Sequence, residues 1–173
     1  MMRLQMVTAK PIVWLFGDEA ANDLRDSLKA LDGVDIDTRC YAYTGATLES
    51  VMDAQLLMAI GSGTLPSAII VAAGAYDAFL IAMGGGDTNI AAAKFETRVN
   101  RLKTALRLRA MENIPLLVHS SLGSKTLCTR LGIPLDWAEQ VRTHGCAEPA
   151  ATGILETLLI GLGCGKDAAH ETS

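Results

Sequence analysis

The chain is poor in aromatic residues and in proline. Aromatic side chains make up 5% of its 173 residues while half of the residues are hydrophobic, so any core must be mainly aliphatic. Sixteen glycines stand against five prolines, which indicates many tight turns rather than a disordered chain. This length suits a single domain with a sizeable core.

Metal-binding cysteine pairs and long apolar runs are also missing. The four cysteines include no Cys-x-x-Cys spacing, which argues against a zinc site. No uninterrupted apolar run reaches the roughly 18 residues of a membrane-spanning helix. The N-terminal segment has one short apolar run, Ile12 to Phe16, and does not resemble a signal peptide. We therefore expect a cytoplasmic protein with free thiols and with neither metal nor cofactor.

Basic residues are scattered apart from one stretch, and the net charge is −4. No aromatic residues that could stack on bases are interleaved with this stretch. A solvated helix face is therefore favoured over nucleic-acid binding. The stretch consists of Arg98, Arg101, Lys103, Arg107 and Arg109.

Short apolar runs alternate with segments of helical periodicity along the chain. Three runs are typical of strands buried on both faces, and a fourth segment alternates apolar and acidic residues like an edge strand. The buried strands are predicted over 12–16, 68–73 and 114–118, and the edge strand over 34–37. Helices are predicted over 18–31, 48–60 and 92–110, a helix-and-loop stretch over 124–142, and a last helix from Pro149 to Leu162.

This alternation predicts βαβ units, a parallel sheet and helices on both of its faces. We expect one domain over 1–165 and a polar tail over 166–173. Ligands of such folds bind beyond the carboxyl ends of the strands. The loops that follow the strands, and the segment before the last helix, are therefore the candidate binding regions.

Four of these regions carry blocks that resemble those of the SGNH, or GDSL-type, hydrolases. The family has Gly-Asp-Ser, a glycine in a G-x-T-like turn, Gly-x-Asn-Asp and Asp-x-x-His-Pro at these places. The corresponding blocks are FGDE at 16–19, TGAT at 44–47, GAYD at 74–77 and HGCAEP at 144–149. The resemblance implies a flavodoxin-like three-layer α/β/α sandwich with a parallel sheet.

The resemblance fails at the catalytic positions. In the family, serine attacks the acyl carbon, histidine takes its proton and aspartate orients the histidine. Glu19, Glu148 and Gly145 occupy these three positions here, and Tyr76 replaces the asparagine of the oxyanion hole. Only Gly45 is retained among the functional positions. Since a carboxylate is a poor acyl acceptor and repels an oxyanion, the resemblance implies a degenerate hydrolase.

Several residues of this crevice have two interpretations. Glu19 and Glu148 either face each other and share a proton or a cation, or they only begin helices, where negative charge is favourable. His144 and Cys146 either form a base and nucleophile, or Cys146 is a small buried hydrophobe. Tyr76 either donates its hydroxyl to a ligand or fills the empty pocket.

The other candidates have mainly structural interpretations. We expect His119 to be a hydrogen-bonded residue at a strand end rather than a base. The glycine-rich loop 83–87 lacks the pattern of a phosphate-binding loop and is interpreted as a lid or hinge. The complete set of ligand-binding candidates is Asp18, Glu19, Gly45, Thr47, Gly74, Tyr76, Asp77, His119, Ser120, His144 and Glu148.

The sequence thus predicts a catalytically degenerate SGNH-like domain that serves as a binding or assembly module. Its ligand would be a protein partner or a small polar or acylated molecule. One alternative is an active esterase or acyl hydrolase with a rearranged site, and another is a structural subunit of a larger complex. The last helix is apolar on more than one face, which favours a homodimer or protein partner there.

Overall fold

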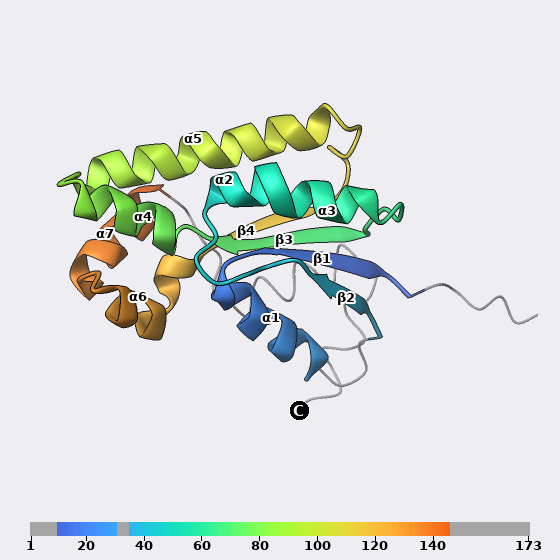
Figure 1. Cartoon of the computed structure of the whole chain (residues 1–173), viewed down its shortest axis with the longest axis horizontal. Helices are drawn as coiled ribbons and strands as arrows, with labels where there is room; N and C mark the ends of the chain where they lie inside the picture. The colour runs from blue at the N-terminus through green and yellow to red at the C-terminus, as the bar shows by residue number, and fades with distance from the viewer. Residues whose placement is uncertain (1–9, 31–34, 146–173) are drawn as a thin grey trace, which may run out of the picture.

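The computed structural model describes residues 10–30 and 35–145, which build one parallel sheet with helices around it (Figure 1). The strands lie in the order β2-β1-β3-β4, and every neighbouring pair is parallel. This is the strand order of flavodoxin-like folds. The strands are β1 Ile12–Gly17, β2 Asp37–Cys40, β3 Ala68–Ala73 and β4 Leu116–Ser120.

Helical segments make the crossovers between these strands. None of the helices in the described part of the chain is long and apolar enough to cross a membrane. The helices are α1 Glu19–Lys29, α2 Leu48–Ser50, the π-helical η1 Val51–Gln55, α3 Leu56–Gly61, α4 Ala75–Met83, α5 Thr88–Arg107, the 3-10 turn η2 Ser121–Gly123, α6 Lys125–Leu131 and α7 Leu135–Gly145.

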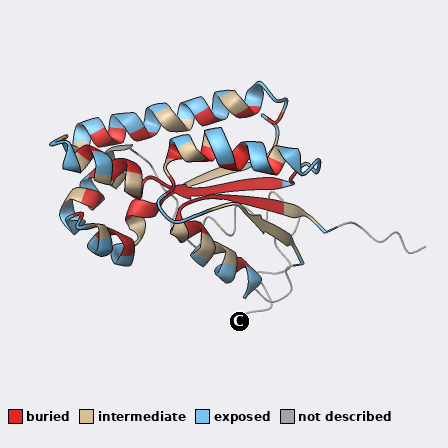
Figure 2. Ribbon diagram, viewed as in Figure 1, coloured by how far each residue is buried: buried red, intermediate tan, exposed pale blue. Residues whose placement is uncertain are grey.

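Both faces of the sheet are covered. Trp14 and Phe16 of β1 point to one face and share a buried cluster with Leu102 of α5. Leu15 points to the opposite face and packs with Leu28 of α1. Figure 2 shows β3 buried throughout and β1 buried except at its first residue, Ile12, while the outer sides of the helices are exposed. The three-layer α/β/α sandwich predicted from the sequence is confirmed.

The edge strand lies further along the chain than predicted. It was expected over 34–37, but β2 pairs Asp37 with Ile12 and Cys40 with Leu15. Its place at the edge of the sheet is as predicted, and its neighbour there is β1. The partners in the ladder, rather than the local alternation of apolar and acidic residues, determine where the strand runs.

The predictions for β4 were also wrong in part. The strand begins at Leu116 rather than Ile114, and four of its five residues are half-buried rather than fully buried. His119 and Ser120 belong to the strand, where His119 pairs with Ala72, and not to the loop behind it. Burial of β4 is lower because, in the described residues, it has a neighbouring strand on one side only.

Helix α4 was not predicted. Its apolar residues surround the helix, so that Ala78 and Ile81 are buried while Leu80 and Met83 are exposed. Such a sequence has no clear helical period. Gly84 ends this helix, and the glycine-rich loop therefore joins two helices.

The remaining helices differ from the prediction in their ends. Helix α5 begins at Thr88 rather than Ala92, because Asp87 caps it by accepting the Ile90 N–H at 2.9 Å. The stretch 124–142 contains two helices, α6 and α7, which Gly132 separates in the left-handed conformation (φ +72°). The last helix, predicted from Pro149, lies outside the described residues.

Candidate functional site

The turn from β1 into α1 depends on Gly17. Its φ is +129°, and a Cβ atom there would lie 1.8 Å from the carbonyl oxygen of Ala72 in β3. Only glycine allows this approach. The fully buried Gln55 holds the turn: it accepts the Gly17 N–H at 2.7 Å and donates its amide to the Gly17 carbonyl at 2.9 Å.

Asp18 is fully buried and connects three strand ends. It caps α1 by accepting the Ala20 N–H at 3.0 Å. Its other carboxylate oxygen accepts the Ser121 hydroxyl at 2.6 Å, and Ser121 in turn accepts the Ala75 N–H at 2.9 Å. Burial raises the pKa of Asp18 to about 6, although the bonds from Ser121 and Ala20 act in the opposite direction. Asp18 therefore holds the loops after β1, β3 and β4 together.

Glu19, the first residue of α1, directly follows Asp18. The Tyr76 hydroxyl donates to Glu19 Oε1 at 2.8 Å, and Arg130 of α6 forms an ion pair with the same oxygen. Oε2 is buried without a hydrogen-bond partner among the described residues. The Tyr76 ring lies beside Gly45, where an added Cβ would be 3.9 Å from its Cε1. The first three predicted blocks therefore meet at Glu19, Gly45 and Tyr76.

The Tyr76 side chain lies between Gly45 and Glu19, and its two predicted roles toward a ligand or an empty pocket remain predictions. Its ring occupies space beside Gly45, and its hydroxyl reaches across to the carboxylate of Glu19. Burial, followed by the negative charge of Asp18, raises the pKa of Tyr76. The hydroxyl therefore remains protonated and acts as the donor toward Glu19.

Asp77 connects the loop after β3 with the loop before α2. Its carboxylate, 3% exposed, accepts the Leu48 N–H at 3.1 Å and the Arg98 guanidinium at 2.6 Å. Burial raises the pKa of Asp77, and these two donors oppose that shift. Thr47 caps α2 by accepting the Ser50 N–H at 3.3 Å. Both candidates therefore fix backbone in place.

Gly74, His119 and Ser120 shape the neighbouring turns. Gly74 has φ +118°, and a Cβ there would lie 2.6 Å from the Phe95 ring. Ser120 is buried and accepts the Leu122 N–H at 3.3 Å, which begins η2. His119 is half-buried, and its ring lies beside Gly123.

The fourth block lies mostly outside the described residues. Gly145 ends α7, whereas Cys146 and Glu148 and the side chain of His144 are beyond what the structure describes. The predicted meeting of Glu19 with Glu148 remains a prediction. In residues 10–30 and 35–145, no group of three or more His, Cys, Asp or Glu side chains could hold a metal ion.

Four residues that build the site were not among the candidates. Ser121 directly follows the candidate Ser120, and Arg98 belongs to the basic stretch, so the sequence contained an indication of both. Gln55 and Arg130 come from helices whose sequence shows no relation to the turn after β1. The residues in question are Gln55, Arg98, Ser121 and Arg130.

Comparison with known proteins finds similarity at the level of structure and none at the level of sequence. No protein-family model matches the chain, and no curated protein matches it. The structure is similar to the crystal structure of AlinE4, an SGNH-hydrolase family esterase, with a TM-score of 0.45 and 14% sequence identity. The match covers 91% of this chain and 95% of that one. The resemblance is distant. It concerns the arrangement of helices and strands.

Proposed function

We propose that this chain is a non-hydrolytic, SGNH-like domain that binds a small polar or acylated ligand at the carboxyl edge of its sheet. The proposal rests on the position of Glu19 in the sequence and on the contacts of its carboxylate. It follows Gly-Asp, where the SGNH motif has its serine, and its carboxylate is held by Tyr76 and Arg130. A paired carboxylate is a poor acyl acceptor, and its charge opposes an oxyanion.

The polar groups at this point suit recognition. Glu19 accepts hydrogen bonds, Tyr76 donates or accepts them, and the guanidinium of Arg130, 57% exposed, donates them. This combination fits a ligand with both a hydroxyl and a carbonyl group. The predicted last helix lies outside the described residues. Dimerisation through it, and binding of a protein partner to it, therefore stay predictions.

The hydrolysis test uses p-nitrophenyl acetate with the natural chain, Glu19→Ser and Glu19→Gln. We expect no turnover above background from any of them. Serine alone does not restore activity, because Glu148 and Gly145 occupy the positions of the base and its orienting aspartate. Turnover by the natural chain that disappears in Glu19→Gln or Tyr76→Phe would instead support an active hydrolase with a rearranged site.

The binding test follows backbone amide chemical shifts during titration with phenyl acetate, an uncharged acyl compound. Shifts are expected in the three loops 17–19, 45–47 and 74–77, and they should weaken in Arg130→Ala. Arg25→Ala, which removes an arginine of α1 that pairs with Asp26, serves as the matched control. A spectrum that does not change would favour the structural-subunit alternative.

A further inference from the structure

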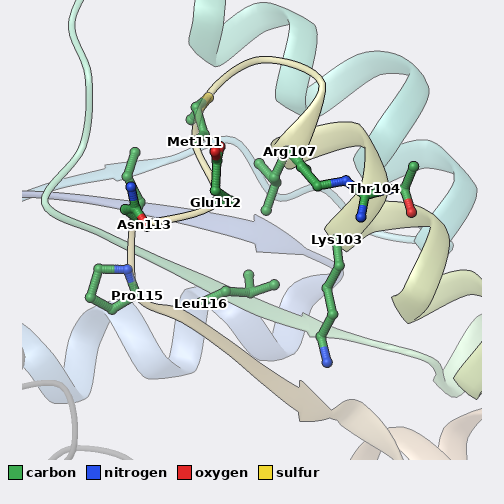
Figure 3. Close-up of a pocket in the computed structure, with 10 residues that line it drawn as sticks. Lys103, Thr104, Arg107, Met111, Glu112, Asn113, Pro115 and Leu116 are labelled. Carbon is green, nitrogen blue, oxygen red and sulfur yellow. The ribbon is translucent and has the colours of Figure 1, made fainter.

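A second candidate ligand site lies at the opposite end of the sheet from Glu19. A cavity of about 470 Å³ opens where α5 ends and β4 begins (Figure 3). Glu19 follows the carboxyl end of β1, whereas this cavity includes Pro115 and Leu116 at the amino end of β4. Its volume is within the range of small-molecule sites, about 300–1,000 Å³.

The floor of this cavity is apolar. Leu106 and Met111 are buried members of the main core cluster, and the half-buried Ile114 and Leu116 pack against it. The floor is therefore the outer surface of a well-packed core. An apolar ligand body placed there would remove additional hydrophobic surface from water.

The rim of the cavity is positively charged. Lys103 and Arg107 lie one turn apart on α5, both exposed, and neither has an ion-pair partner in the described part of the chain. Glu112 is the acidic residue of the lining, so the rim carries one net positive charge on a chain whose net charge is −4. Figure 3 shows Lys103 on the α5 side and Asn113 on the loop side.

The loop that forms one wall has a strained turn. Ala110 has φ 55°, the one positive φ at a non-glycine residue in the described chain. This turn lets the Met111 N–H donate to the Leu106 carbonyl at 3.0 Å and places Met111 in the floor. Strained backbone of this kind persists where the surrounding structure fixes it, which gives the cavity a preformed wall.

We propose that this cavity binds a small organic anion, namely a carboxylate carried on an aromatic or short aliphatic body. The carboxylate would accept charge-assisted hydrogen bonds from Lys103 and Arg107, and the body would cover Met111 and Leu116. Thr104 and Asn113 supply further hydrogen-bonding groups at the rim. The proposal is independent of any role of Glu19.

The test is an NMR titration of the full chain with benzoate, and with benzamide as its uncharged counterpart. Benzoate should shift amides within 103–116, and benzamide should bind more weakly. Lys103→Ala and Arg107→Ala should each weaken benzoate by about fivefold, which is what an exposed ion pair of good geometry contributes. Glu112→Gln should strengthen it, because it removes the opposing charge. Hexanoate in a parallel titration distinguishes an aliphatic from an aromatic body.

Lys94→Ala is the matched control, since Lys94 is an exposed cation of the same helix away from the cavity. All four substitutions are of exposed residues, so the variants should fold. Equal affinity for benzoate and benzamide, or unchanged affinity in both Lys103→Ala and Arg107→Ala, would overturn the proposal. Shifts confined to Glu19 and Arg130 would likewise overturn it and would assign the anion to the other end of the sheet.

Discussion

The buried carboxylate of Asp18 makes the stability of the fold depend on pH. Its pKa rises from an ordinary 3.8 to about 6 in the folded chain. A raised pKa means that the folded state binds the proton more tightly than the unfolded state. The contribution to stability is present below about pH 3.8 and is lost as the pH rises through about 6, a change of about 3 kcal/mol.

We therefore predict that Asp18→Asn changes the pH dependence of stability. Asparagine can still cap α1 through its amide oxygen, and its amide NH2 donates to the Ser121 oxygen instead of accepting from it, but asparagine does not titrate. Urea unfolding of the natural chain and the variant between pH 4 and pH 7 should show the variant gaining relative stability by up to about 3 kcal/mol toward neutral pH. Asp23→Asn, at an exposed position on α1, is the control. Parallel pH profiles for the natural chain and Asp18→Asn would contradict the assignment.

At the residue scale, the sequence identified the places but not the contacts. Asp18 was predicted to start a helix, and it does so as the cap of α1. Glu19 begins that helix, but its bonds to Tyr76 and Arg130 could not be predicted, since they join residues far apart in sequence. A pairing of this kind depends on how α4 and α6 pack at the strand ends.

At the scale of elements, the turn after α5 places an alanine, Ala110, in a backbone conformation that favours glycine. Ala110 adopts the left-handed conformation that usually ends a helix with glycine. We predict that Ala110→Gly raises the free energy of unfolding by about 1 kcal/mol, because it relieves the clash of Cβ with the backbone. Urea unfolding at constant pH measures this change.

The matched control for this prediction is Ala93→Gly within the same helix. Ala93 is exposed in the interior of α5, where glycine costs about 1 kcal/mol. The two alanine-to-glycine changes should therefore have opposite signs. A loss of stability in both would show that position 110 is not strained.

Element types were more predictable than element ends. Strands β1 and β3 were expected from their continuous apolar runs, and both are buried where predicted except for the half-buried Ile12. Helix α4 escaped prediction because its apolar residues surround it, and β4 shifted because its ladder with β3, not its own pattern, defines it. An element buried on one side has apolar residues at a regular spacing in the sequence. Helix α4 and strand β4 have no such spacing.

At the scale of the whole molecule, α5 joins two parts of the core. Its Phe95 and Leu102 belong to the main cluster between α5 and the sheet, whereas Ala91 and Ala92 belong to a second cluster with α4, α6 and α7. Figure 1 shows these three helices gathered at one end of the sheet, with α5 running along the molecule. A shared helix of this length should couple the two clusters in one cooperative unit.

We predict that the two clusters unfold together. The chain has two tryptophans: Trp14 is buried in the main cluster, and Trp137 packs against the second. In Trp137→Phe and in Trp14→Phe, the urea midpoint from the remaining tryptophan should coincide with the midpoint from far-UV circular dichroism. Fluorescence of Trp137 that changes at lower urea than the helical signal would reveal an independent unit of α6 and α7.

The buried hydrogen bonds around the turn after β1 determine which positions of this site can be substituted. The turn after β1 is held by hydrogen bonds of Gln55, Asp18 and Ser121. None of these hydrogen bonds involves the side chain at position 19. Exchange of Glu19 therefore changes the polar groups that face a ligand without rebuilding the scaffold. A library that randomises 17–19 should return glycine alone at 17, few residues at 18 and many at 19. Single substitutions at position 19 can therefore change which ligand is recognised while the fold is retained.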